Sequence, residues 1–148
     1  MSFEFTTNDY KIIGEILNTE PMHLSDMYRY EILKDNPVRR LSLEIYPNIQ
    51  IGKNIGNLIS LYSINSHLQL QFCNGYVASE MLGEITFYSD SENKISGLII
   101  EKEGGCSLFA NVDKSVLSGD FANLAPEIMM SSIALSLTET SFDELNED

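Results

Sequence analysis

Apolar and polar residues alternate along most of this chain, first with the period of a helix and then with the period of strands. At about 100° per residue, the apolar positions of residues 9–18 fall on one side of a helix. Thr7 or Asn8 supplies a side-chain cap, and Glu20 and Pro21 end the element. The pattern predicts an amphipathic helix whose buried face is made of Tyr10, Ile12, Ile13, Ile16 and Leu17.

From about Met27 the period changes to two. The run MYRYEILK predicts a strand, with a helix capped by Ser25 as the alternative. Residues 40–46 alternate cleanly, which is typical of an antiparallel strand with one wet face. The segment PNIQIGKNIGN, residues 47–57, predicts a loop, or a strand end with a glycine-bearing turn.

Short strands follow in quick succession. Residues 57–64 and 66–72 predict two strands, and Asn74–Gly75 predicts a type I′ turn into a return strand over 76–82. Two more strands follow over 84–90 and 94–103, and Gly104–Gly105 turns the chain into 106–112. Because residues 95–100 are apolar on both sides, we expect them to form an interior strand. A short edge strand is predicted within 113–121.

The C-terminal part predicts a second helix over about 125–138, with Pro126 in its first turn. The tail over 139–148 is acidic and is expected to fray. The predicted fold is therefore a single α+β domain over 1–138, a curved antiparallel meander or partly closed barrel of about seven to nine strands with a helix at each end. The helix has a main apolar stripe of Met129, Met130, Ile133, Ala134 and Leu137, and Leu124, Ile128 and Leu135 on its far side.

Length and composition fit this architecture. A chain of 148 residues that is 43% hydrophobic is long enough for one core without disulfides or metal. Cys73 and Cys106 stand beside apolar neighbours, so both are predicted to be reduced and packed. The N-terminus lacks the basic and apolar regions of a secretory signal, and no apolar run is long enough to span a bilayer. A cytoplasmic protein is expected.

Motifs that carry chemistry are missing from the sequence. With two histidines, no Cys/His cluster, no phosphate-binding loop and no nucleophile elbow, we expect no metal, no cofactor and no enzymatic activity. The stretch 113–120 lacks the ligand order of a calcium loop. Paired carboxylates satisfy acid–base catalysis at many sequence spacings, but 22 acidic residues make coincidental pairs unavoidable.

Charge is the strongest global signal. The net charge is −13, and residues 61–148 hold fourteen acidic but only three basic side chains. Such a surface repels phosphate, so neither direct nucleic-acid binding nor binding to a membrane is expected. It favours a basic protein partner, because charge of one sign speeds encounter. We therefore expect an inhibitor or immunity-type protein, for example against a toxin nuclease, with the partner-binding candidates Glu80, Glu84, Asp90, Glu92, Glu101, Glu103, Asp113 and Asp120.

Two other functions fit the same sequence. A secretion-type chaperone would be a homodimer, joined through Leu124, Ile128 and Leu135. A β-barrel that binds a small apolar ligand would need an interior cavity. Its lining is predicted to be Leu68, Leu70, Phe72, Tyr76, Phe87 and Ile99.

Overall fold

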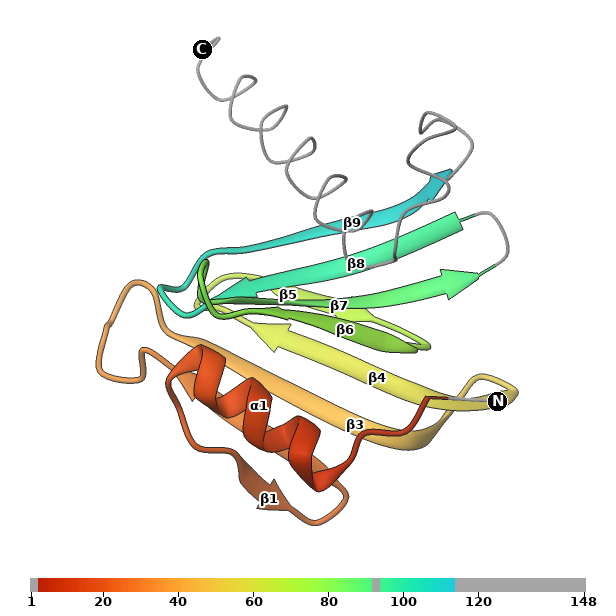
Figure 1. The fold of residues 1–148 in the computed structure, drawn as a ribbon, viewed down its shortest axis with the longest axis horizontal. Coiled ribbons are helices and arrows are strands. Elements are labelled where there is room, and N and C mark those ends of the chain that lie inside the picture. Colours follow the sequence, from red (N-terminus) through yellow and green to blue (C-terminus); the bar gives the residue numbers. More distant parts are fainter. Residues whose placement is uncertain (1–2, 92–93, 114–148) are drawn as a thin grey trace, which may run out of the picture.

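The computed structural model describes residues 3–91 and 94–113, and this part of the chain is mostly β-structure (Figure 1). It contains nine antiparallel strands in two separate sheets and one short N-terminal helix. The helix is α1 (Thr7–Leu17). The first sheet holds β1 (Met22–Leu24), β2 (Met27–Ile32), β3 (Leu41–Ile51), β4 (Asn54–Tyr62) and β5 (His67–Leu70), in that order. The second holds β6 (Gly75–Ser79), β7 (Glu84–Ser91), β8 (Lys94–Glu101) and β9 (Cys106–Asp113), also in chain order.

The helix α1 forms where the apolar period predicted it, although its cap differs. The N-cap is Thr6, whose hydroxyl accepts a hydrogen bond from the Asp9 amide at 3.2 Å, while the Asp9 carboxylate accepts one from the Thr6 amide at 2.8 Å. Asn18, with a φ of 57°, ends the helix in the left-handed conformation. The prediction of a helix was right, and the caps predicted at Thr7 or Asn8 were one or two residues too late.

Hydrogen bonds attach α1 to both sheets. The hydroxyl of Tyr30, which is fully buried in β2, donates to the Tyr10 carbonyl at 2.7 Å. The hydroxyl of Tyr76 in β6 donates to the Asp9 carboxylate at 2.6 Å. Because α1 contacts β2, β6 and β7, while β5 contacts β7 and β8, the helix closes the side of the sandwich that lies away from β5.

The main core fills the space between the two sheets and α1. Strands alternate their side chains between two faces, so every second residue of the central strands points into this space. Its members come from all three layers. The fully buried residues include Ile13 and Leu17 from the helix, Leu43, Ile45, Ile59 and Leu61 from the first sheet, and Ile85, Phe87, Leu98 and Ile100 from the second.

Strand periodicity was read correctly in most of the described chain. Residues 27–32 form strand β2, so the alternative helix is wrong. The segment 47–57 is a strand end and turn: β3 continues to Ile51 and β4 begins at Asn54, with Gly52 at a φ of +61° between them. The predicted interior strand is β8, which lies between β7 and β9 and is buried on both faces.

The hairpin predicted at Asn74–Gly75 is wrong. Neither residue has a positive φ, and β5 and β6 belong to different sheets. Gly75 is needed because a Cβ there would meet the ring of Tyr88. Asn74 holds the crossover: its side chain donates to the Asp90 carbonyl at 2.9 Å and accepts from the Asp90 amide at 3.0 Å.

The partly closed barrel is also wrong, because this crossover divides the meander into two sheets and no closed barrel forms in the described residues. The residues predicted to line a barrel cavity do not share one interior either. Leu70 and Phe87 are buried in the main core, with Leu68 and Tyr76 packed against it, whereas Phe72 is 37% exposed. Ile99 lies on the opposite face of the second sheet.

Asn57 connects three parts of the chain beside the crossover. It is 3% exposed, and its side-chain amide donates to the carbonyls of Phe3 and Cys73 at 2.9 and 3.0 Å. Its carbonyl oxygen accepts from the amide of Asn48 at 3.1 Å, in the bulge that shifts the β3–β4 register. One amide side chain therefore positions the N-terminal segment, the bulge and the crossover.

Several predictions fall beyond the described residues. These are the edge strand beyond Asp113, the second helix with Leu124, Ile128 and Leu135, the tail over 139–148, and the domain boundary at 138. Both cysteines are free, but only Cys73 is buried; Cys106 is exposed, which corrects the prediction that both are packed. The error has a simple cause, since Cys106 opens the edge strand of the second sheet.

Candidate functional site

The six candidate acidic residues that the structure describes divide into two groups at opposite ends of the second sheet. Glu80, Glu84, Glu101 and Glu103 lie where β6 turns into β7 and β8 turns into β9. Asp90 and Asp113 lie at the other end, beside the start of β8. At about 3.4 Å per residue, the eight residues of β8 place the groups roughly 24 Å apart. Glu92 and Asp120 lie outside the described residues.

Glu84 and Glu101 face each other across neighbouring strands. They are register partners between β7 and β8. Burial raises the pKa of the Glu84 carboxyl, and the charge of Glu101 raises it further. Like charges opposite each other destabilise a sheet, so this pair opposes folding in the isolated protein.

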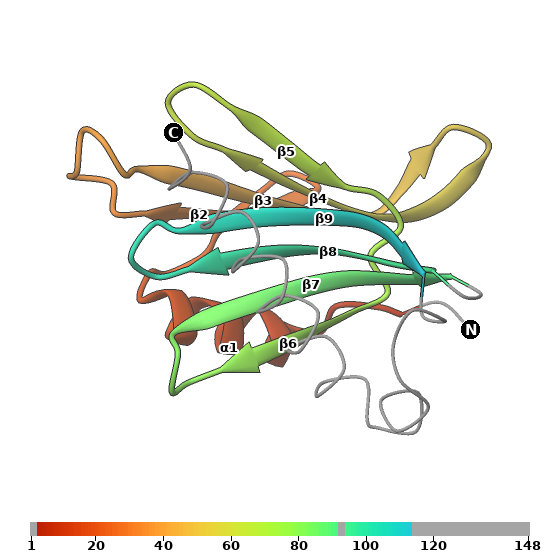
Figure 2. The same cartoon turned by 90° about the horizontal axis from the view of Figure 1, so that it is seen from above.

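Four connections come together at the same end of the molecule, which we name the loop end: residues 33–40, 63–66, 80–83 and 102–105 (Figure 2). The antiparallel register places the first two at one end of the first sheet and the last two at one end of the second. A close approach joins these ends, because a Cβ on Gly104 would lie 2.9 Å from the Arg39 carbonyl oxygen and 3.1 Å from the Leu33 side chain. Gly104 also has a φ of +95°, which favours glycine.

The loop end carries most of the strongly exposed aliphatic side chains of the described chain. Met81 is 94% exposed, Val38 77%, and Ile64 and Leu82 60% each. Of the described large apolar residues, only Ile55, in the β3–β4 hairpin at the other end, is exposed to a similar degree. Aliphatic residues grouped in this way and flanked by charge are typical of a protein-binding surface.

Charges on the loop end are arranged by sheet. The second sheet contributes the four glutamates and Lys102, whereas the loop over 33–40 from the first sheet contributes Lys34, Asp35, Arg39 and Arg40. The acidic half is therefore next to a basic half. Such a surface would hold a partner in one orientation, because reversing the partner would bring like charges together.

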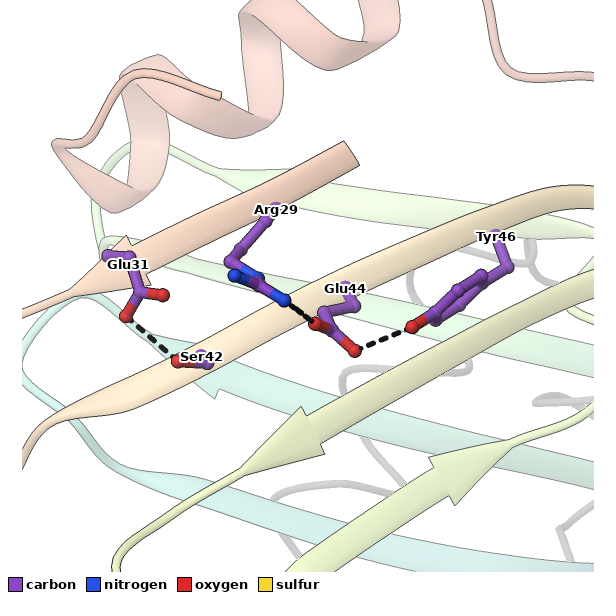
Figure 3. Close-up of polar contacts among 5 residues, drawn as sticks. All are labelled: Arg29, Glu31, Ser42, Glu44 and Tyr46. Carbon is purple, nitrogen blue, oxygen red and sulfur yellow. Dashed lines mark hydrogen bonds and ion pairs between the residues drawn. The ribbon is translucent and has the colours of Figure 1, made fainter. Parts of the chain in front are cut away.

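A polar network occupies the outer face of the first sheet (Figure 3). Glu44 in β3, whose side chain is 7% exposed, accepts hydrogen bonds from Arg29 at 2.7 and 3.0 Å on one oxygen and from the Tyr46 hydroxyl at 2.8 Å on the other. Beside it, the Ser42 hydroxyl donates to Glu31 at 2.8 Å. Because both carboxylate oxygens of Glu44 are engaged, this network is a structural support and offers no free base.

The thiols are not activated either. Burial raises the pKa of Cys73 to about 12, although hydrogen bonds to Gly75 and Tyr88 oppose the change. Burial, and then the charge of Glu101, raises the pKa of Cys106. The thiolate is the reactive form of cysteine, so both residues are poor nucleophiles at neutral pH.

Metal-binding groups and membrane-spanning helices are absent from the residues that the structure describes. In residues 3–91 and 94–113 no three His, Cys, Asp or Glu side chains are grouped so as to hold a metal ion. The helix in this part of the chain is too short to cross a membrane. No family model matches the chain, and comparisons with curated proteins and with solved structures found no significant match.

Sequence reasoning found the acidic half of the loop end but missed its apolar part. The predicted return strand over 76–82 includes Met81 and Leu82, whereas β6 ends at Ser79 and both side chains are exposed. Gly83 was the available signal, because a glycine just after two apolar residues marks a turn, and its φ is +64°. The contact of Gly104 with the loop over 33–40 joins residues about 65 positions apart and has no local signal.

Proposed function

We propose that this chain is a small acidic protein that binds and neutralises, or escorts, a basic partner protein through its loop end. The observation that carries the proposal is the exposure of Met81 and Leu82 beside four glutamates, two of which oppose each other across β7 and β8. Cytoplasmic toxin nucleases and their immunity proteins are one pair of this class. A nuclease must be basic to hold phosphate, so an acidic protein can occupy the same surface.

The charge pair supports the proposal energetically. Glu84 and Glu101 repel each other in the isolated protein, and a cation of the partner placed between them would remove this repulsion while gaining two attractions. The aliphatic side chains then supply the apolar contacts that charge alone does not give. Burying an exposed Met or Leu side chain contributes about 1.5–3 kcal/mol.

Long-range attraction and local orientation have different sources in this proposal. The net charge of −13 attracts a basic protein from any direction and speeds encounter by about 10- to 1000-fold at low salt. The basic loop over 33–40 adds orientation, since it would face acidic or neutral parts of the partner. Asp90 and Asp113, at the far end of the second sheet, contribute only to the general attraction.

The test compares two variants of equal net charge. In the first, Glu80, Glu84, Glu101 and Glu103 are replaced by Gln; in the second, four exposed acids of the N-terminal region are replaced by the corresponding amides, at Glu4, Glu15, Glu20 and Asp26. Each is co-expressed and co-purified at low salt with the proteins encoded beside its gene, and association rates are measured from 25 to 300 mM salt. We expect a basic protein whose association with the first variant is at least tenfold slower than with the second.

A second pair of variants isolates the apolar contact. Met81→Ser should leave the association rate and the folding of the protein unchanged. It should speed dissociation of the complex about tenfold, because the lost contact forms after docking. Ile55→Ser, at the opposite end, should leave the dissociation rate unchanged. Equal association rates for the two charge variants, or a rate that does not fall with salt, would refute binding through the loop end.

A further inference from the structure

The outer face of the second sheet carries an apolar cluster that is separate from the main core. Ile95 is 1% exposed, and Ile99 and Phe109 are 6% exposed, with Tyr88 and Val112 packed against them. Leu98 and Ile100, the alternate residues of β8, point the other way into the main core. The second sheet is therefore apolar on both faces, as expected of a sheet with a layer on each side.

Within the described chain, every member of this outer cluster comes from β7, β8 or β9. These strands form one layer, and an apolar sheet face is normally covered by a second layer, whereas a solvated face is polar, as the outer face of the first sheet is. A sheet face of this kind needs a covering element. The described helix does not supply it, because Tyr10, Ile13, Ile16 and Leu17 of α1 belong to the main core.

We propose that residues 114–138 of the same chain cover this face. The strand β9 is the edge of the second sheet and ends at Asp113, so the rest of the chain starts beside the face. From 124 to 138 the sequence has a single charged residue, Glu127. Its apolar stripe, Met129, Met130, Ile133, Ala134 and Leu137, has the spacing of a helix that packs on a sheet.

Dimensions support this occupant. A helix over 125–138 would be about 21 Å long at 1.5 Å per residue, which is within the roughly 24 Å that separate the two ends of the eight-residue strand β8. The eleven residues over 114–124 span up to about 35 Å when extended, enough to turn back across the four strands. The layers would then be this helix, the second sheet, the main core and the first sheet, in that order. The inference does not depend on the proposed function, and its test uses no partner.

The test measures amide hydrogen exchange over residues 125–138 in the full chain. The parent is compared with one pair of variants in β9 of the second sheet. Phe109→Ala removes a ring from the outer cluster, whereas Leu108→Ala removes a side chain of the neighbouring residue on the other face, where it is 41% exposed. We expect protected amides in the parent chain and exchange at least tenfold faster in Phe109→Ala, with Leu108→Ala like the parent. Amides of β2–β4 serve as an internal control for the fold.

A second pair lies in the segment itself. Ile133→Asp places a charge on the predicted stripe and should increase the fluorescence of a dye that binds exposed apolar surface, whereas Ser132→Asp, one residue away, should not. Unprotected amides over 125–138, or equal effects of the two variants in either pair, would overturn the proposal. Protection that disappears on dilution from 100 to 1 µM would also overturn it, because it would assign the cover to a second copy.

Discussion

Replacing Asn57 should weaken the fold more than any other single polar substitution in β4. Its side chain makes three hydrogen bonds in a site that is 3% exposed, to Phe3, Asn48 and Cys73. Each such bond contributes about 1 kcal/mol net, so Asn57→Ala should cost about 3 kcal/mol. That is a large part of the roughly 5–15 kcal/mol that stabilises a domain of this size.

Asn57→Asp tests whether the side-chain nitrogen of Asn57 donates to the two backbone carbonyls. The shape is nearly unchanged, but an anionic oxygen would replace the group that now donates to the carbonyls of Phe3 and Cys73. At pH 7 this variant should be less stable than Asn57→Ala, because a buried charge beside two carbonyl oxygens is costlier than a lost hydrogen bond. As the pH falls, the new carboxyl group binds a proton and can donate, so the difference from the parent should shrink.

Urea unfolding provides the measurement. The chain has no tryptophan and seven tyrosines, so tyrosine fluorescence and far-ultraviolet circular dichroism are the probes. Asn54→Ala and Asn54→Asp, at the exposed start of the same strand, should lie within about 0.5 kcal/mol of the parent. Two results would refute this account of the crossover. One is an Asn57→Ala variant whose free energy of unfolding lies within 1 kcal/mol of the parent's, and the other is an Asn57→Asp variant that is more stable than Asn57→Ala at pH 7.

Three further substitutions have defined outcomes in the same unfolding assay. Arg29→Met should cost about 2 kcal/mol, because it leaves the buried Glu44 carboxylate without its cation while the half-exposed position of the arginine limits the loss. Glu84→Gln should stabilise the protein by about 0.5 kcal/mol at pH 7, and the gain should vanish as the pH falls through the acidic range, where the raised pKa of this carboxyl favours the protonated folded state. Gly14→Ala should destabilise the protein although alanine favours helices, because its Cβ would lie 2.7 Å from the Thr19 carbonyl oxygen.

Each of these expectations is contradicted by a definite result. A stability of Arg29→Met equal to that of the parent would mean that the ion pair is dispensable. A Glu84→Gln variant that gains more at pH 4 than at pH 7 would contradict the linkage, since a raised pKa in the folded state makes stability fall as the pH rises. A more stable Gly14→Ala variant would mean that the chain after α1 can move away from the added methyl group.

The sequence by itself determined the elements that local chemistry specifies. The helical period of residues 10–17 and the alternation of residues 41–46 gave the correct types, because each residue contributes to the same buried face whatever that face packs against. Apolar residues on both sides of β8 correctly indicated an interior strand. The concentration of acid in the second half of the chain is likewise a property of composition alone.

Only the tertiary structure decided how the strands are grouped. Asn74–Gly75 has the local preference for a type I′ turn, but contacts with Tyr88, Asp90 and Asn57 hold this segment as a crossover between sheets. Those residues are about 13 to 17 positions away, so no local pattern contains them. The pairing of strands, the division into two sheets and the gathering of four connections at the loop end all follow from contacts between distant residues, which burial and hydrogen bonding select only when the whole chain is folded.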